Sequence, residues 1–174
     1  MPLEKRLRLL KPFSRVILSA CGSSKPSRPS GKLPKITSNI RVKAEIILKS
    51  VRNLNFIAET FRKTGGVHAA AIYGKDGNLL AFAEDVGRHN AVDKAIGISS
   101  INKVDFSQCL LTLSGRITGD IVLKAARVGI PIVASLAAAV DSGITTAKAA
   151  NLTLVGFVRG RRMNVYSTPR RILS

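Results

Sequence analysis

The sequence has few of the residue types that mark several common protein classes. Aromatic side chains make up 5% of its 174 residues, so the stacking platforms that hold single-stranded nucleic acid are scarce. Two cysteines do not make a disulfide scaffold, which favours a reducing compartment. No apolar run approaches the roughly 20 residues that span a bilayer, and the longest, 130–140, has the size of a core segment. We therefore expect a cytoplasmic protein with no membrane partner.

Acidic residues are also few. Ten Asp and Glu stand against 28 Lys and Arg, which gives a formal net charge of +18. Residues 1–52 hold 13 basic and 2 acidic residues, and residues 53–174 hold 15 and 8. Such a positive field concentrates phosphate-bearing partners such as nucleic acid, nucleotides or acidic proteins. Nucleic acid is the less favoured partner, because no helix-turn-helix or zinc-finger spacing is present.

The composition divides the chain into a basic segment and one domain. Residues 22–39 hold five Ser, three Pro and no acidic residue, which is typical of a mobile loop or linker. The remainder, in a chain that is 45% apolar, is long enough to bury a core. We therefore expect a basic N-terminal segment with a cysteine loop and a Ser/Pro-rich linker over 1–39, followed by an α/β/α domain over 40–174.

Hydrophobic periodicity predicts the first elements of this domain. Apolar residues recur at helical spacing over 40–63, which predicts a long amphipathic helix that Gly65 and Gly66 end. Two strand-like runs, 67–73 and 79–83, flank a turn signal rich in Gly, Asp and Asn. This pattern predicts a β-hairpin.

Beyond the hairpin, apolar runs alternate with helical patterns. The predicted order is helix 89–96, strand 110–113, helix 118–128, strand 130–134, helix 142–150 and strand 152–158. Strands that are apolar on both faces and alternate with helices indicate a parallel sheet covered on both sides. The expected fold is α/β, a three-layer α/β/α sandwich with a mixed, largely parallel sheet.

Three polar segments fall at the carboxyl ends of predicted strands, where open α/β sheets bind ligands. They are the charged run 84–94, the turn 114–116 before a helix, and 157–162, where an apolar strand runs into three arginines. The candidate ligand-binding residues are Gly87, Arg88, Asp93, Ser114, Gly115, Arg116, Phe157, Val158, Arg159, Gly160, Arg161 and Arg162. The alternative is that these charges pair across a helix start and that the arginine turn is a solvated hairpin.

The two cysteines lie in different settings. Cys21 lies in a loop with Lys25 and Arg28, whose charge lowers a thiol's pKa and makes an exposed thiolate usable as a nucleophile or sulfur carrier. A surface thiol without a function is the alternative. Cys109 precedes an apolar run and is expected to be a buried small apolar residue. Two dissimilar cysteines and two histidines fall short of tetrahedral zinc, so no metal site is expected.

Several segments together resemble a known family. The run Glu-Asp-Val-Gly-Arg-His-Asn-Ala-Val-Asp-Lys at 84–94 is similar to the signature of the formate dehydrogenase accessory proteins, the FdhD family of sulfur carriers (FdhD/NarQ-like). The other segments that agree in order are 64–70, 114–116, 124–131, 152–157 and 164–166. The resemblance is to the family's C-terminal domain, with a shorter N-terminal part.

The resemblance implies a cytidine-deaminase-like core and a sulfurtransferase role. Family members take sulfur as a persulfide from a cysteine desulfurase, here on Cys21, and pass it to molybdenum (or tungsten) bis-pyranopterin guanine dinucleotide before that cofactor enters formate dehydrogenase. The segment 157–162 matches the one associated with the cofactor. GDP is then expected to mimic part of this ligand, and a homodimer is a further expectation.

One departure from the family pattern keeps a second function open. The family loop reads Cys-x-x-Cys, whereas this chain has Cys21-Gly22-Ser23-Ser24, and the hydroxyl of Ser24 cannot carry sulfane sulfur. A non-catalytic module that only binds or delivers the pyranopterin cofactor is therefore the alternative. A nucleic-acid-binding protein is the third interpretation.

Overall fold

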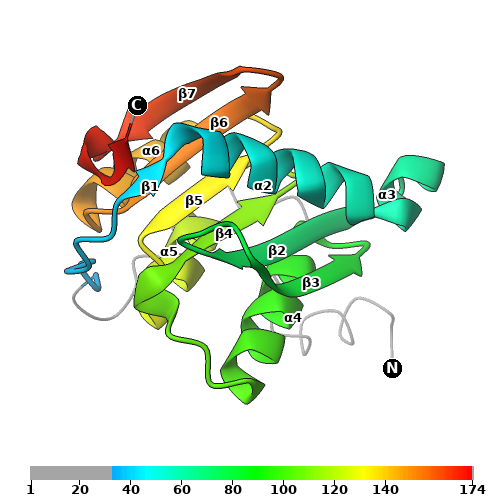
Figure 1. Cartoon of the computed structure of the whole chain (residues 1–174), viewed down its shortest axis with the longest axis horizontal. Coiled ribbons are helices and arrows are strands. Elements are labelled where there is room, and N and C mark those ends of the chain that lie inside the picture. The colour runs from blue at the N-terminus through cyan, green and yellow to red at the C-terminus, as the bar shows by residue number, and fades with distance from the viewer. Residues whose placement is uncertain (1–32, 174) are drawn as a thin grey trace, which may run out of the picture.

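The computed structural model describes residues 33–173, which form a layered α/β fold (Figure 1). The segment 1–32, with Cys21, lies outside the described residues. The strands are β1 (Val42–Lys43), β2 (His68–Gly74), β3 (Leu79–Asp85), β4 (Cys109–Leu113), β5 (Ile132–Ser135), β6 (Thr153–Arg159), β7 (Arg162–Ser167) and β8 (Ile172–Leu173). The helices are α2 (Ala44–Ile57), α3 (Glu59–Thr64), α4 (Arg88–Ile101), α5 (Gly119–Val128) and α6 (Asp141–Ala149), with short 3-10 turns at Phe106–Gln108 and Pro169–Arg171.

Six strands form one mixed sheet in the order β3-β2-β4-β5-β6-β7, and β1 pairs with β8 apart from it. β4, β5 and β6 pair in parallel, whereas β2 is antiparallel to β3 and β4, and β6 is antiparallel to β7. The predicted mixed sheet is confirmed, but the parallel pairings are two of five rather than the majority. The short turns of the β2–β3 and β6–β7 hairpins join only antiparallel strands, while α5 and α6 supply the crossovers that parallel pairs need.

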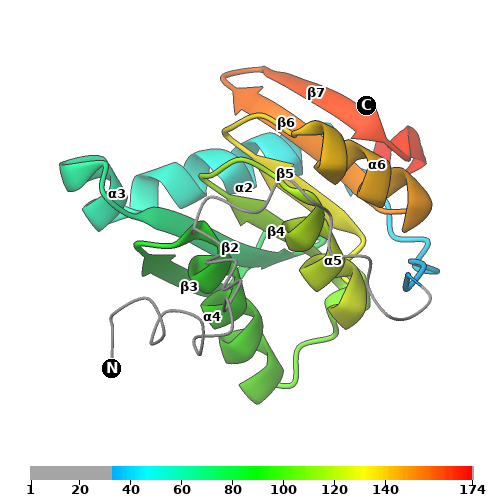
Figure 2. The ribbon, with the colours of Figure 1, turned by 180° about the vertical axis from the view of Figure 1, so that it is seen from behind.

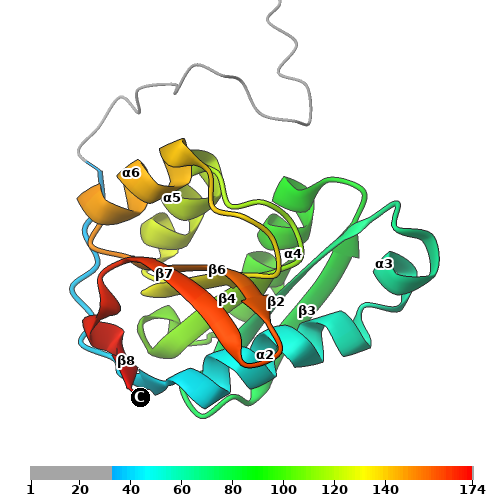
Figure 3. The same cartoon turned by 90° about the horizontal axis from the view of Figure 1, so that it is seen from above.

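Helices cover both faces of this sheet, as the predicted sandwich requires. α2 lies on one face, and α4, α5 and α6 lie on the other (Figures 2 and 3). The strand residues alternate between the two cores that result. In β2, Ala69, Ala71 and Tyr73 join the core under α2, and Ala70 and Ile72 join the core under the other helices. The three-layer α/β/α architecture is therefore confirmed.

The helix predicted over 40–63 is interrupted. α2 begins only after β1, and the backbone leaves helical geometry at Ala58, with φ −77° and ψ 75°, before α3 resumes. The predicted apolar face is nevertheless confirmed, because Ile47, Val51, Leu54 and Ala58 are all buried. Periodicity thus located the buried face but not the break.

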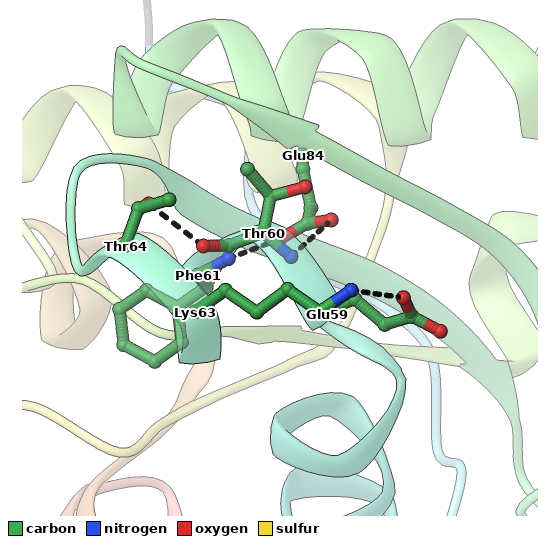
Figure 4. A network of polar contacts seen from close by, with 6 residues as sticks. All are labelled: Glu59, Thr60, Phe61, Lys63, Thr64 and Glu84. Carbon is green, nitrogen blue, oxygen red and sulfur yellow. Dashed lines mark hydrogen bonds and ion pairs between the residues drawn. The ribbon is translucent and has the colours of Figure 1, made fainter.

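A carboxylate of β3 accounts for the break. Glu84 accepts hydrogen bonds from the backbone N–H groups of Thr60 (3.3 Å) and Phe61 (2.7 Å), as Figure 4 shows. In an uninterrupted helix those N–H groups would bond to carbonyls four residues earlier. Glu84 replaces these partners and ties α3 to the sheet. Gly65 then ends α3 in the left-handed region, with φ 63°, as predicted.

The described end of the predicted linker packs against the domain. Ile36 is buried, and its N–H donates to the carbonyl of Ala150 (2.8 Å). Arg171 is also buried and donates through Nε to the carbonyl of Ser38 (3.0 Å). These contacts make residues from Leu33 onward part of the packing of the domain. None of the helices in residues 33–173 combines the length and apolar character needed to cross a membrane.

Candidate functional site

Four strands end at one edge of the sheet, and the three polar segments predicted from the sequence follow them. β3, β4, β5 and β6 run in one direction, and β2 runs in the other. The first residue of β2, His68, therefore lies at this edge, opposite Asp85. In the neighbouring strands, Ala70 pairs with Leu113, and Leu113 with Ser135. These strand pairings place the ends of β3, β4 and β5 side by side, so the polar segments that follow the strands lie at the same edge of the sheet.

The turn 114–116 packs directly against the start of α4. A Cβ at Gly115 would lie 3.1 Å from Nδ1 of His68 and 3.3 Å from the Cβ and Cδ of Arg88. Glycine is needed at this point because a side chain would push both neighbours away. The structure thus brings the first two predicted segments together and adds His68, which was not among the candidate ligand-binding residues. We call His68, Arg88, Ser114, Gly115 and Arg116 the edge cluster.

Arg88 is the most informative member of the edge cluster. Its side chain is buried, with 8% of the residue exposed, and it takes part in none of the ion pairs of residues 33–173. Its Nε is buried without a hydrogen-bond partner in that part of the chain, as is Oγ1 of Thr118 just before α5. A buried charge costs several kcal/mol unless it is paired and hydrogen-bonded. This arrangement is typical of a site for an external anion.

His68 adds a polar ring beside two guanidinium groups. Burial, followed by the charges of Arg88 and Arg116, lowers the pKa of His68 below its usual 6.5. The imidazole is therefore neutral at pH 7. Its Nδ1 lies 3.5 Å from Oγ of Ser114, and that oxygen accepts a hydrogen bond from the N–H of Ala69 (3.0 Å).

Asp85 shapes the turn that leads into α4. Its Oδ2 pairs with Nζ of Lys94 (2.5 Å), and its Oδ1 accepts from the N–H of Gly87 (2.9 Å) and from Nδ2 of Asn90 (3.1 Å). The Lys94 ammonium, and then these two donors, lower the pKa of Asp85 to about 2. For Asp85, the structure confirms the alternative to ligand binding, in which the charges of this run pair with one another across a helix start.

Asp93 lies one and a half turns into α4, on a side that faces α5. Its exposed carboxylate pairs through Oδ2 with Nζ of Lys124, and no hydrogen bond of Oδ1 is found within residues 33–173. The same ammonium lies 3.5 Å from the carbonyl of His89. One carboxylate oxygen of Asp93 is therefore free to accept from a ligand, and its predicted binding role stays a prediction.

The third predicted segment forms the hairpin between β6 and β7. Arg159 pairs with Arg162 across a turn in which Gly160 has φ 58°. Arg161 completes the turn, and all three arginines are exposed. The structure does not bury these side chains against the edge cluster. The turn is a solvated hairpin, as the alternative interpretation expected, and its arginines are accessible to a ligand.

Phe157, at the base of this hairpin, has an unusual backbone. Its φ is 51°, it lies where the β6–β7 pairing is irregular, and its side chain is 44% exposed. A positive φ is a strained conformation for a bulky aromatic residue, and such strain clusters at functional sites. The neighbouring Val158 is instead buried, with 3% exposed, so it supports the strand from within the core.

Hydrogen bonds connect the hairpin to the edge cluster through the loop after β5. The N–H of Phe157 donates to the carbonyl of Ala137 (3.0 Å). The N–H of Ala137 in turn donates to Oγ of Ser135 (3.0 Å). That hydroxyl lies 2.6 Å from the carbonyl of Gly115 and 2.9 Å from that of Leu113. Ser135, which the sequence analysis did not single out, therefore fixes the turn against the hairpin.

Neither the described cysteine nor the metal-ligating residue types form a reactive site within residues 33–173. Cys109 is buried as predicted, and burial raises the pKa of its thiol to about 11, so it is not a reactive thiolate. Within residues 33–173, no group of three His, Cys, Asp or Glu side chains could hold a metal ion. The predicted sulfur-carrying residue, Cys21, lies outside this range.

Comparison with known proteins identifies the family. The sequence model of the FdhD/NarQ family matches residues 4–173. The chain belongs to this family. It is 40% identical over 163 residues to the sulfur carrier protein FdhD of Thermoplasma volcanium, a match that covers 91% of this chain and 58% of the relative. The identity to the FdhD of Sulfolobus acidocaldarius is 45% over 139 residues, which cover 79% of this chain and 54% of that protein.

Solved structures confirm the fold expected of an FdhD-type domain. A formate dehydrogenase accessory protein from Desulfotalea psychrophila is 34% identical, with a TM-score of 0.73 over 80% of this chain and 59% of its own. A deaminase/reductase of Thermotoga maritima, diaminohydroxyphosphoribosylaminopyrimidine deaminase/5-amino-6-(5-phosphoribosylamino)uracil reductase, is 14% identical with a TM-score of 0.51, over 66% of this chain and 37% of its own. The second likeness confirms the deaminase-like fold alone. The chain spans little more than half the length of its FdhD relatives.

Proposed function

We propose that this FdhD/NarQ family member is a sulfurtransferase that works on a bound cofactor as its substrate. The edge cluster holds the diphosphate of molybdenum (or tungsten) bis-pyranopterin guanine dinucleotide, and Cys21 carries persulfide sulfur to it. The sulfur comes from a cysteine desulfurase, and the recipient of the sulfurated cofactor is formate dehydrogenase. The observation that carries the binding part is Arg88, a buried residue whose Nε has no hydrogen-bond partner and whose charge has no carboxylate partner in residues 33–173.

Three further observations support a polyanionic substrate. The charges of Arg88 and Arg116 both act on the neutral ring of His68, so the edge cluster offers donors of charged and neutral kinds. The exposed arginines of the β6–β7 hairpin lie at the same edge of the sheet. The net charge of +18 concentrates such a ligand near the protein. Relatives that carry the name sulfur carrier protein support the second half of the proposal.

Guanine recognition gives the first testable prediction. GDP, which represents half of the nucleotide portion of the cofactor, is expected to bind more tightly than ADP. Guanine offers an exocyclic amine and a ring N–H to a carboxylate such as Asp93, and adenine offers no such pair. Calorimetric titration of the full chain with both nucleotides measures the difference. Equal affinities would remove base recognition from the proposal.

The hairpin arginines give the second prediction. A charge-assisted hydrogen bond contributes about 1.5 to 3 kcal/mol, so Arg161→Ala or Arg162→Ala is expected to weaken GDP binding roughly tenfold or more. The control is Arg52→Ala, which removes the same charge from an exposed position in α2, on the other face of the sheet. Its effect should vanish at physiological salt, where the Debye length is about 8 Å. Equal losses in all three variants, at low salt only, would assign the hairpin to a general basic surface.

Sulfur transfer gives the third prediction, which concerns Cys21. Its thiolate is expected to attack the terminal sulfur of a desulfurase persulfide, which expels the donor's thiolate and leaves Cys21 as a persulfide. Mass spectrometry after incubation with a desulfurase and cysteine should find one added sulfur on the peptide that contains Cys21. The buried Cys109, with its raised pKa, is the internal control and should stay unmodified. Sulfur on Cys109 would defeat the assignment to Cys21, and sulfur on neither residue would favour the alternative of a module that binds the cofactor without sulfur transfer.

A further inference from the structure

His68 and Ser114 form a polar pair at the start of β2 and the end of β4. Oγ of Ser114 accepts the N–H of Ala69 at 3.0 Å, so one lone pair of this buried hydroxyl is used. The hydroxyl has a single proton to donate, and Nδ1 of His68 lies 3.5 Å away. If the hydroxyl donates this proton to Nδ1, a neutral His68 carries its own proton on Nε2.

The charges around His68 keep the ring neutral. Arg88 faces it from α4 and Arg116 from the turn after β4, and together with burial they lower its pKa. Asp85, its neighbour in β3, does not compensate, because Lys94 and two further donors occupy its carboxylate. A third positive charge at this place is therefore disfavoured before an anion binds.

The Nε2 side of the ring has no hydrogen-bond partner among residues 33–173, although the Nδ1 side contacts Ser114 and lies against Gly115. In this tautomer a neutral N–H donor lies where the charges of both Arg88 and Arg116 act, and Arg88 is the buried one of the two. Charged donors supply most of the attraction for an anion, whereas a donor on a rigid ring defines where one acceptor oxygen lies.

We propose that His68 is a binding residue of the edge cluster, which donates Nε2–H to an oxygen of the bound diphosphate as the tautomer that Ser114 selects. The inference rests on the proposed role of the edge cluster and adds a residue to it. Ser114 acts as a positioning residue, because it reaches the ligand only through the imidazole. The predicted ligand class is a nucleoside diphosphate or an equivalent phosphoanhydride.

Nitrogen NMR tests this directly, because the chain has only two histidines. In protein with ¹⁵N-labelled histidine, the His68 ring should show an unprotonated Nδ1 and a protonated Nε2 at pH 7, and His89→Gln assigns the two rings. Addition of GDP should shift the Nε2 resonance of His68 more than that of His89. In Ser114→Ala the single tautomer should give way to a mixture of both. A protonated Nδ1 in the wild-type protein would overturn the inference, and this spectrum needs no substitution at His68.

Substitution of His68 supplies the matching affinity measurement. His68→Leu removes the donor and is expected to weaken GDP binding roughly two- to tenfold, the range of a neutral hydrogen bond. His68→Gln can place an amide N–H near the same position and should retain most of the affinity. Unchanged GDP affinity in His68→Leu would overturn this inference and leave the proposed function standing. So would GDP binding to the wild-type protein that does not shift the His68 resonances. Wild-type protein that does not bind GDP would overturn the proposed function and this inference with it.

Discussion

Arg88→Met is expected to weaken GDP binding tenfold or more while leaving the fold at least as stable. The loss follows from the removal of a charge-assisted contact, worth about 1.5 to 3 kcal/mol. The stability follows from burial. Arg88 is buried and no carboxylate in residues 33–173 pairs with it, so its charge adds little to stability, and methionine fills much of the same space without a charge. Calorimetry with GDP and thermal unfolding without it measure the two effects.

The matched control for Arg88 is Arg127→Met. Arg127 is an exposed residue in the last turn of α5, at the end of the helix that is remote from the edge cluster. Arg127→Met therefore removes the same charge at a distant position. Its substitution should leave GDP affinity within about twofold, as expected of an exposed charge that a Debye length of about 8 Å screens. If Arg88→Met instead unfolds at a lower temperature and binds GDP normally, Arg88 is a structural residue.

Gly143→Ala is expected to produce the largest loss of stability. A Cβ at Gly143, in the first turn of α6, would lie 2.5 Å from the carbonyl oxygen of Ile117, a distance that real Cβ atoms essentially never show. That carbonyl is fixed, because it accepts the N–H of Val140 at 3.0 Å. The helix or the loop must therefore move, at a cost of about 1 to 3 kcal/mol. For a chain of this size, each kcal/mol lowers the melting temperature by about 2 to 4 °C.

Gly97→Ala is the control for this prediction. Gly97 lies inside α4, and a Cβ there would have no heavy atom within 4 Å. Alanine in a helix interior without a steric conflict stabilises by up to about 1 kcal/mol. The two substitutions are chemically identical and should shift the melting temperature in opposite directions. A melting temperature of Gly143→Ala at or above that of the wild type would show that α6 does not pack against Ile117 as described.

Much of the fold could be predicted from periodicity because most elements are local. The strands β4 and β6 and the helices α5 and α6 were predicted within one or two residues of their observed ends. Periodicity could not reveal the break at Ala58, because the cause is Glu84, a residue more than twenty positions away that takes over two backbone donors of α3. Nor did it reveal β7, an edge strand of the sheet that mixes polar and apolar residues and leaves three of its six residues exposed.

The parts of the candidate site that lie directly after a strand could be predicted from the sequence. The segments around Arg88 and Gly115 follow β3 and β4, and the rule that ligands bind at carboxyl ends was enough to find them. His68 lies at the amino end of β2, which the predicted hairpin already places beside the end of β3, but it meets Ser114 only because β2 also runs antiparallel to β4. The sequence did not reveal that pairing. Ser135 was missed for a related reason, since its role depends on hydrogen bonds to the carbonyls of the neighbouring turn.

Binding of a guanine nucleotide diphosphate by the edge cluster can be observed in a crystal structure of the full chain with GDP. We expect diphosphate oxygens within hydrogen-bond distance of the guanidinium groups of Arg88 and Arg116, which would give Arg88 the partner that residues 33–173 do not supply. GDP bound at another surface, with the guanidinium of Arg88 still unpaired, would contradict this expectation.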